Sequence, residues 1–252
     1  MKKAIIATSL ATALCATSVQ ADTLLGLYIG GQVWANQADG TFGEGESDQA
    51  AFNFDDQNQG SYFIALEHPI PLIPNVKIAS TTLDTIGGTT IETSFTIGGE
   101  TYSANAQLDT TFDASYVDYT FYYEVFDSDL FTFDFGLTAR DLDSKIGVVE
   151  PVTSKNSDLS VSGYLPLLYV NTIIGLPFTG FNVFAEANFL SYDDNSVYDY
   201  QIGVSYAVLD NLAVDLDVTL GYRSVKLELN DIDDLYSDLT FDGVFAGATV
   251  HF

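Results

Sequence analysis

The last fourteen residues, Leu239 to Phe252, read LTFDGVFAGATVHF and alternate apolar side chains with small or polar ones. Counting back from the terminal phenylalanine, one face carries Val250, Ala248, Ala246 and Val244, and the other carries His251, Thr249, Gly247 and Phe245. A period of two residues is typical of a strand that separates two unlike environments. The stretch therefore predicts a β-strand at the end of the chain, with an aromatic residue as its last member.

The other end of the chain has the pattern of a secretory signal peptide over residues 1 to 21. Lys2 and Lys3 precede an apolar run, and small residues at Val19 and Ala21 predict cleavage between Ala21 and Asp22. The apolar run is too short for a spanning helix. The single cysteine of the chain is Cys15, so the mature protein has no thiol for a disulfide or a thiolate metal site.

The mature chain is strongly acidic and also strongly apolar. Cleavage would remove two lysines and no acid, leaving six basic residues against 35 acidic ones, a net charge of −29. Such a balance excludes nucleic-acid binding through a basic patch. A hydrophobic fraction of 47% excludes an acidic disordered chain. No later apolar run reaches helical spanning length, so strands of a closed barrel are the remaining way for this chain to cross a bilayer.

Ten segments have the alternation of strands, and we predict an all-β, antiparallel, up-and-down transmembrane β-barrel over residues 22–252. The predicted strands cover 24–35, 60–68, 76–85, 114–126, 131–140, 159–174, 181–189, 198–206, 212–223 and 239–252. The register of the sixth strand stays open, because residues 165–170 are apolar on both faces and Pro166 cannot donate a ladder hydrogen bond. Eight strands are the alternative if two of the weaker segments lie outside the bilayer.

The predicted connections alternate in length, as in outer-membrane barrels with short periplasmic turns and long external loops. Residues 36–59, 86–113, 141–158 and 230–238 are expected to be long loops, and a two-residue hairpin is expected at Gly98-Gly99. Aromatic residues near the strand ends of the apolar face predict interfacial girdles. The predicted girdle residues are Tyr62, Phe189, Tyr198, Tyr200 and Tyr222 on the loop side, and Tyr123, Phe131, Phe181, Tyr206 and Phe252 on the turn side.

One turn carries a more specific resemblance. The segment EHPIPLIPN at 67–75, with LPFTG at 176–180, resembles a proteobacterial family of small outer-membrane β-barrel proteins whose function is uncharacterised. The terminal aromatic is shared with many other outer-membrane barrels, where the closing strand carries the signal for the barrel assembly machinery. The resemblance implies an outer-membrane location and a barrel fold, and it provides no catalytic residues.

The polar face of the predicted strands places charged residues in the lumen. The expected ion network consists of Lys77, Asp118, Glu124, Asp134, Arg140, Glu186, Asp215, Asp217 and Arg223. Charges inside a narrow barrel should be paired, because an isolated buried ion is costly. Two interpretations follow: the network plugs the lumen, or its excess of acids forms a cation-selective constriction.

We predict no catalytic, cofactor or metal site. Only two histidines are present, and the predicted topology puts both His68 and His251 at the periplasmic strand ends. The known barrel enzymes resemble one another in using a histidine near the outer rim, which this chain does not offer. Acids at 193–194 and 231–234 lack EF-hand spacing, so divalent-ion bridging to lipopolysaccharide phosphates is only a weaker hypothesis.

The sequence thus favours a non-enzymatic outer-membrane barrel with a structural or surface-interaction role and a largely plugged lumen. A narrow cation-preferring channel is one alternative. A soluble, secreted, lipocalin-like barrel is the other.

Overall fold

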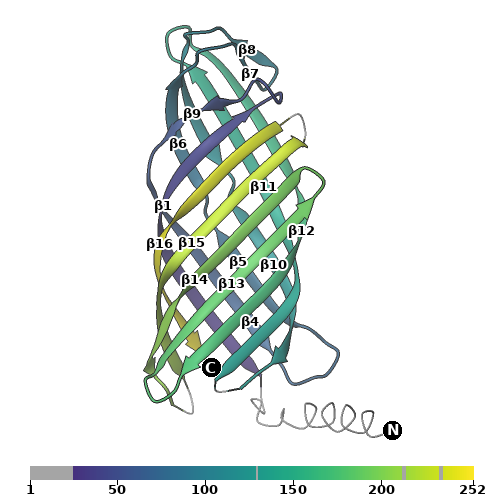
Figure 1. The fold of residues 1–252 in the computed structure, drawn as a ribbon, viewed down its shortest axis with the longest axis vertical. Coiled ribbons are helices and arrows are strands. Elements are labelled where there is room, and N and C mark those ends of the chain that lie inside the picture. The colour runs from purple at the N-terminus through teal and green to yellow at the C-terminus, as the bar shows by residue number, and fades with distance from the viewer. Residues whose placement is uncertain (1–24, 129, 212–213, 233–234) are drawn as a thin grey trace, which may run out of the picture.

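The computed structural model describes residues 25–128, 130–211, 214–232 and 235–252, and in these residues the chain is all-β. No helix among them is long and apolar enough to cross a membrane. Ten antiparallel strands form the wall in the order β10-β5-β4-β1-β16-β15-β14-β13-β12-β11, and β10 pairs with β11 to close it (Figure 1). The wall strands are β1 (Gly26–Gly43), β4 (Gln57–Glu67), β5 (Asn75–Thr81), β10 (Tyr116–Phe126), β11 (Phe131–Glu150), β12 (Lys155–Leu176), β13 (Phe181–Tyr192), β14 (Asn195–Leu209), β15 (Asp215–Ile232) and β16 (Leu235–His251).

The C-terminal strand closes the barrel as predicted. β16 pairs with β15 on one side and with β1 on the other, and His251 is opposite Tyr28 in β1 and Asp215 in β15. Backbone hydrogen bonds join Phe252 and Leu27 in both directions, at 3.0 and 3.3 Å. The ten-stranded closed barrel is confirmed and the eight-strand alternative is wrong, because each of the ten predicted segments has two neighbours in the wall.

Short strands complete the end of the barrel opposite Phe252 and the start of β1. β9 (Gln107–Asp113) continues the wall beyond β10 by pairing with the upper part of β11, and β6 (Asp84–Thr90) pairs with β9. The predicted hairpin is present as β7 (Phe95–Ile97) and β8 (Glu100–Tyr102), and Gly98 and Gly99 occupy its turn at φ of 60° and 72°. β2 (Ala50–Ala51) and β3 (Asn53–Phe54) are two-residue bridges to β1 and β6.

The side-chain alternation reverses its polarity halfway along the barrel. In the lower part of β11, Phe135 and Leu137 face outward and are exposed, whereas Thr138 faces inward and is buried. In the upper part the inward face becomes apolar, with Ile146 and Val148 buried, and the outward face carries Asp141, Asp143 and Lys145. The lower half is therefore apolar outside and polar inside, and the upper half has the opposite arrangement.

The upper half, which we call the dome, encloses an apolar core. β1, β15 and β16 also reverse their polarity along their length. The hairpin β7–β8, at the top of the barrel in Figure 1, adds its own buried side chains. Phe42 and Phe52 stack with ring centroids 4.7 Å apart in this core. The largest fully buried apolar members include Trp34, Phe42, Leu83, Phe95, Ile97, Tyr102, Leu108, Ile146, Phe241 and Phe245.

The dome corrects four expectations about loops. Residues 36–59 were expected to form a loop, but β1 continues to Gly43 and pairs with β16 as far as Tyr236. Residues 86–113 contain four short strands, β6 to β9. The predicted loop 141–158 reduces to the turn 151–154, and the predicted loop 230–238 is mostly strand, since β15 ends at Ile232 and β16 begins at Leu235. The physical reason is that an outward face in water favours the same polar residues that mark loops.

The structure also determines the register of β12. Pro166 is opposite Ala139 in β11, and β13 pairs with β12 only from Leu168 to Leu176. The upper part of β12 therefore has one ladder neighbour among the described wall strands. A proline, which lacks a backbone N–H donor, is tolerated in such a one-sided stretch.

Candidate functional site: the lumen

Two arginines and two aspartates meet in the lumen just below the dome core. Arg140 donates from Nε and Nη2 to the two carboxylate oxygens of Asp118, at 2.8 Å each, and from Nη2 to Oδ2 of Asp199 at 2.6 Å. Arg223 donates to both carboxylate oxygens of Asp199, at 3.0 and 2.9 Å. The Tyr116 hydroxyl donates to Asp199 at 2.6 Å. We call these five residues the arginine cluster.

The arginine cluster lies between the polar lumen and the apolar core. The Arg140 guanidinium is 3.6 Å from the centroid of the Tyr116 ring, and the Arg223 guanidinium is 5.2 Å from the Trp34 ring in the dome. All four charged side chains are at least nine-tenths buried. Two positive and two negative charges balance, and bidentate geometry offsets the cost of removing them from water.

The arginine cluster contains residues that the sequence prediction missed. Asp118, Arg140 and Arg223 were predicted to face the lumen together, and the structure brings them to this level. Asp199 and Tyr116 were not singled out. Asp199 lies on the polar face of β14, so alternation could have placed it inside, but the closeness of β14 to β11 across the lumen depends on the closure of the barrel.

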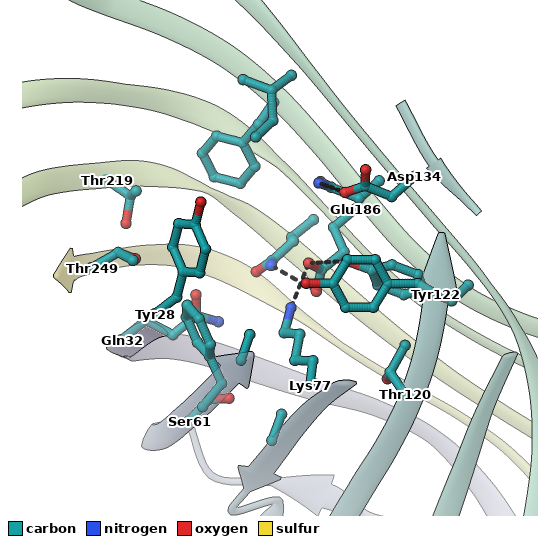
Figure 2. Close-up of a pocket in the computed structure, with 18 of the residues that line it drawn as sticks. Tyr28, Gln32, Ser61, Lys77, Thr120, Tyr122, Asp134, Glu186, Thr219 and Thr249 are labelled. Atoms are coloured by element: carbon teal, nitrogen blue, oxygen red, sulfur yellow. Dashed lines mark hydrogen bonds and ion pairs between the residues drawn. The ribbon is translucent and has the colours of Figure 1, made fainter. Parts of the chain in front are cut away.

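Below the arginine cluster the lumen contains a cavity of about 350 Å³ (Figure 2). Its lining extends from Asp199 and Arg223 down to Asp127 in the exposed turn between β10 and β11, so the cavity reaches the turn end of the barrel. Lys77 donates to Glu186 at 2.6 Å, and its ammonium lies 4.9 and 5.7 Å from the ring centroids of Phe63 and Tyr169.

Two of the other acids of the cavity accept hydrogen bonds from side-chain amides. Asp134 accepts from the Asn171 amide at 2.8 Å, and Glu124 accepts from the Asn75 amide at 3.0 Å. Figure 2 shows Asp134 and Glu186 on the same side of the cavity, opposite Tyr28 and Gln32. Among the described ion pairs, the only one within this cavity below the arginine cluster is Lys77 with Glu186. Six acids line the cavity there: Glu67, Glu124, Asp127, Asp134, Glu186 and Asp217.

Asp215 and Asp217 lie at the turn end, apart from the arginine cluster. Asp217 lines the cavity, and Asp215 lies 3.4 Å from Nδ1 of His251. The His251 ring stacks on Tyr28 with centroids 4.1 Å apart, and Nδ1 of His68 accepts the backbone N–H of Ile70 at 3.3 Å. Both histidines therefore occupy the turn end, where the sequence placed them.

The aromatic residues predicted to form girdles lie on the lower outer face. Nine of the ten are exposed, between 39% and 66%, and Phe189 is half-buried. Phe189 pairs with Tyr198 across β13 and β14, and Phe181 pairs with Tyr206 at the other end of the same strands. These two pairs are thus separated along β13 and β14.

Of the acids predicted to lie in loops, Asp193 and Asp194 occupy the turn between β13 and β14, and Asp231 lies near the end of β15. Asp193 and Asp231 have φ of 54° and 59°, a left-handed conformation that aspartate tolerates better than most residues. They line a surface hollow together with Glu46, Asp194 and Glu228. Among the described residues there is no group of three or more acidic, histidine or cysteine side chains that could hold a metal ion. Asp233 and Asp234, and the predicted cleavage site at Ala21 and Asp22, lie outside the described residues.

No protein-family model and no curated protein sequence matches the chain. Several solved structures are similar to it in architecture. The CymD monoaromatic hydrocarbon channel has 9% identity and a TM-score of 0.35, with 96% of this chain and 92% of that chain covered. A Pseudomonas aeruginosa FadL homologue has 8% identity and a TM-score of 0.30, with 90% of each chain covered. The P. putida toluene transporter TodX has 8% identity and a TM-score of 0.26, with 92% of this chain and 90% of that chain covered. Likeness at this level gives this chain neither a substrate nor a mechanism.

Proposed function

We propose that this protein is an outer-membrane barrel that does not conduct ions, and that its dome serves a structural or interaction role at the cell surface. The observation that carries the proposal is the apolar core that fills the dome from Trp34 to the β7–β8 hairpin. Water and ions have no favourable path through side chains packed at such density. The balanced arginine cluster closes the lumen immediately below this core.

The outer face supports the membrane location. Below the dome it carries exposed apolar side chains from every wall strand, including Val33, Ile64, Leu137, Val204 and Leu220. A contiguous apolar belt with aromatic residues near its edges matches the hydrocarbon layer and interfaces of a bilayer. A soluble lipocalin-like barrel would instead bury this face, so the belt weighs against that alternative.

A narrow cation-preferring channel is the second candidate, and one observation favours it. The cavity below the arginine cluster has six acids and one lysine, an excess that would attract cations. Conduction would require the arginine cluster and the dome core to open.

We also propose that β16 provides the recognition strand for the barrel assembly machinery, and that lipids and lipopolysaccharide surround the belt.

We propose no enzymatic activity, since the two histidines lie at the turn end and no catalytic group is recognisable among the described residues of the dome. Lipid or peptide hydrolysis by the purified folded protein would contradict this.

The test is single-channel recording of the refolded protein in a planar bilayer under a salt gradient. Asp134→Asn and Glu186→Gln variants are measured alongside, with far-UV circular dichroism to verify folding. We expect no conductance steps from any of the three proteins. Steps with a cation-selective reversal potential, weakened by either variant, would overturn the sealed barrel and establish the channel.

A further inference from the structure

One lateral row of the wall carries three of the six acids that line the cavity below the arginine cluster. The strand pairing places Glu124 opposite Asp134, Asp134 opposite Asn171, Asn171 opposite Glu186, and Glu186 opposite Gln201. Adjacent strands are about 4.8 Å apart, so these five side chains form a continuous arc around the cavity. All five side chains carry an acceptor oxygen and none carries a positive charge, and the Asn171 amide already donates to Asp134.

Two acceptors of this arc lack a partner. Oδ1 of Asp134 and Oε1 of Gln201 are buried atoms without a hydrogen-bond donor, and both side chains line the cavity. The Asp134 side chain is itself buried, with 4% exposure. A buried carboxylate oxygen without a donor is costly, so a donor brought by a bound molecule would be favoured there.

The cavity already accommodates one ammonium group in its wall. The Lys77 ammonium binds Glu186 and lies near the Phe63 and Tyr169 rings. Carboxylate on one side and aromatic faces on the other are the surroundings that suit organic cations. Tyr122 and Tyr169, with ring centroids 5.6 Å apart, extend this aromatic wall toward Asp134 and Glu124.

From these observations we propose that the lumenal cavity binds a small organic ammonium ion, held by Asp134, Glu124 and the Gln201 carbonyl oxygen. A volume of about 350 Å³ is on the order of ten water molecules, which is enough for a short linear amine. An ammonium group suits the site better than a metal ion, because no described group of three metal-ligating side chains is present. The site lies below the arginine cluster and does not depend on whether the barrel conducts.

The experiment is isothermal titration calorimetry of the full refolded protein with 1,4-diaminobutane, in detergent at fixed ionic strength. The matched neutral probe is 1,4-butanediol. Asp134→Asn keeps the shape of the side chain and removes its charge, and Asp143→Asn makes the same change on the exposed outer face of the dome. A Gln201→Leu variant tests the neutral acceptor.

We expect saturable binding of the diamine at one site and none of the diol. Asp134→Asn should weaken binding about tenfold or more, since hydrogen bonds to a charged group are among the stronger ones. Gln201→Leu should weaken it less, and Asp143→Asn should leave it unchanged. The proposal would be overturned if the folded protein showed no saturable binding of the diamine, or if Asp134→Asn bound it as tightly as the unmodified protein. Competition by potassium as strong as that of the diamine, at the same ionic strength, would also overturn it.

Discussion

Arg140 of β11 and Asp199 of β14 form an ion pair of 2.6 Å across the lumen, although β12 and β13 separate their strands in the wall. Both side chains are almost completely buried, at 1% and 5% exposure. The pair therefore ties together two parts of the barrel that share no backbone hydrogen bonds. It also marks the level at which the interior changes from polar to apolar.

Removing Arg140 should destabilise the barrel strongly. Arg140→Ala leaves Asp118 without its cation and Asp199 with only Arg223, and breaking a buried pair in this way costs about 3–5 kcal/mol. The measurement is urea unfolding in detergent or lipid vesicles, followed by tryptophan fluorescence of Trp34. Lys145→Ala is the control, because its pair with Asp143 is two-thirds exposed and should contribute about 0–1 kcal/mol. Equal effects of the two substitutions would contradict the cluster.

The dome core should be the main source of stability in the upper half. Phe241→Ala empties a fully buried position, and losses of this kind cost about 3–5 kcal/mol. Leu220→Ala, on the outer belt at 60% exposure, should cost less because lipid or detergent fills the vacated space. The free energy of unfolding in lipid vesicles distinguishes the two. A larger loss for Leu220→Ala would mean that the dome is not packed as described.

Cysteine labelling should locate the membrane. With Cys15 in the predicted signal peptide, the mature protein offers a background without thiols. A membrane-impermeant maleimide should label Ser162→Cys on the dome in intact cells, and Leu72→Cys at the β4–β5 turn only after the outer membrane is permeabilised. Leu137→Cys, in the belt, should stay unlabelled in both conditions. Labelling of Leu137→Cys in intact cells would contradict the proposed membrane position.

The surface of the dome should resist proteases. Residues 36–43 belong to a strand paired on β16, and paired strands are poor protease substrates because cleavage requires local unfolding. Proteinase K added to intact cells should leave the chain uncut. A variant with a glycine-serine insertion between Thr153 and Ser154, in the exposed β11–β12 turn, provides the positive control. Cutting of the unmodified protein within 36–43 at the same protease concentration would contradict the tall strands.

The sequence alone predicted the strands that cross the apolar belt, because Phe135 and Leu137 in β11 alternate with Asp134 and Thr138 in the expected sense. It missed the dome, where Leu142, Ile146 and Val148 take the inward positions and polar residues face water. A polar outward face cannot be told from a loop by composition. The signal that distinguishes a strand from a loop here is the set of apolar residues at the inward positions, which alternate in the phase opposite to that of the lower half.

The candidate site was predictable in part for a related reason. Alternation on a single strand indicates that Arg140, Asp134 or Glu186 faces the interior, and the structure finds all three there. It does not indicate which side chain on a distant strand lies opposite. Asp199 was therefore missed as the partner of Arg140, and the arc from Glu124 to Gln201 became visible only with the register of five neighbouring strands.

The reversal of polarity along β11 and β12 has a consequence for how the barrel avoids misassembly. A slip of one residue between these strands would turn Phe135 and Leu137 into the lumen and, on the same strand, turn Ile146 and Val148 out into water. The mispaired lower half would expose polar side chains to lipid, and the mispaired upper half would expose apolar side chains to water. The correct register of this one hairpin is therefore favoured twice, once by the lipid around its lower half and once by the water around its upper half.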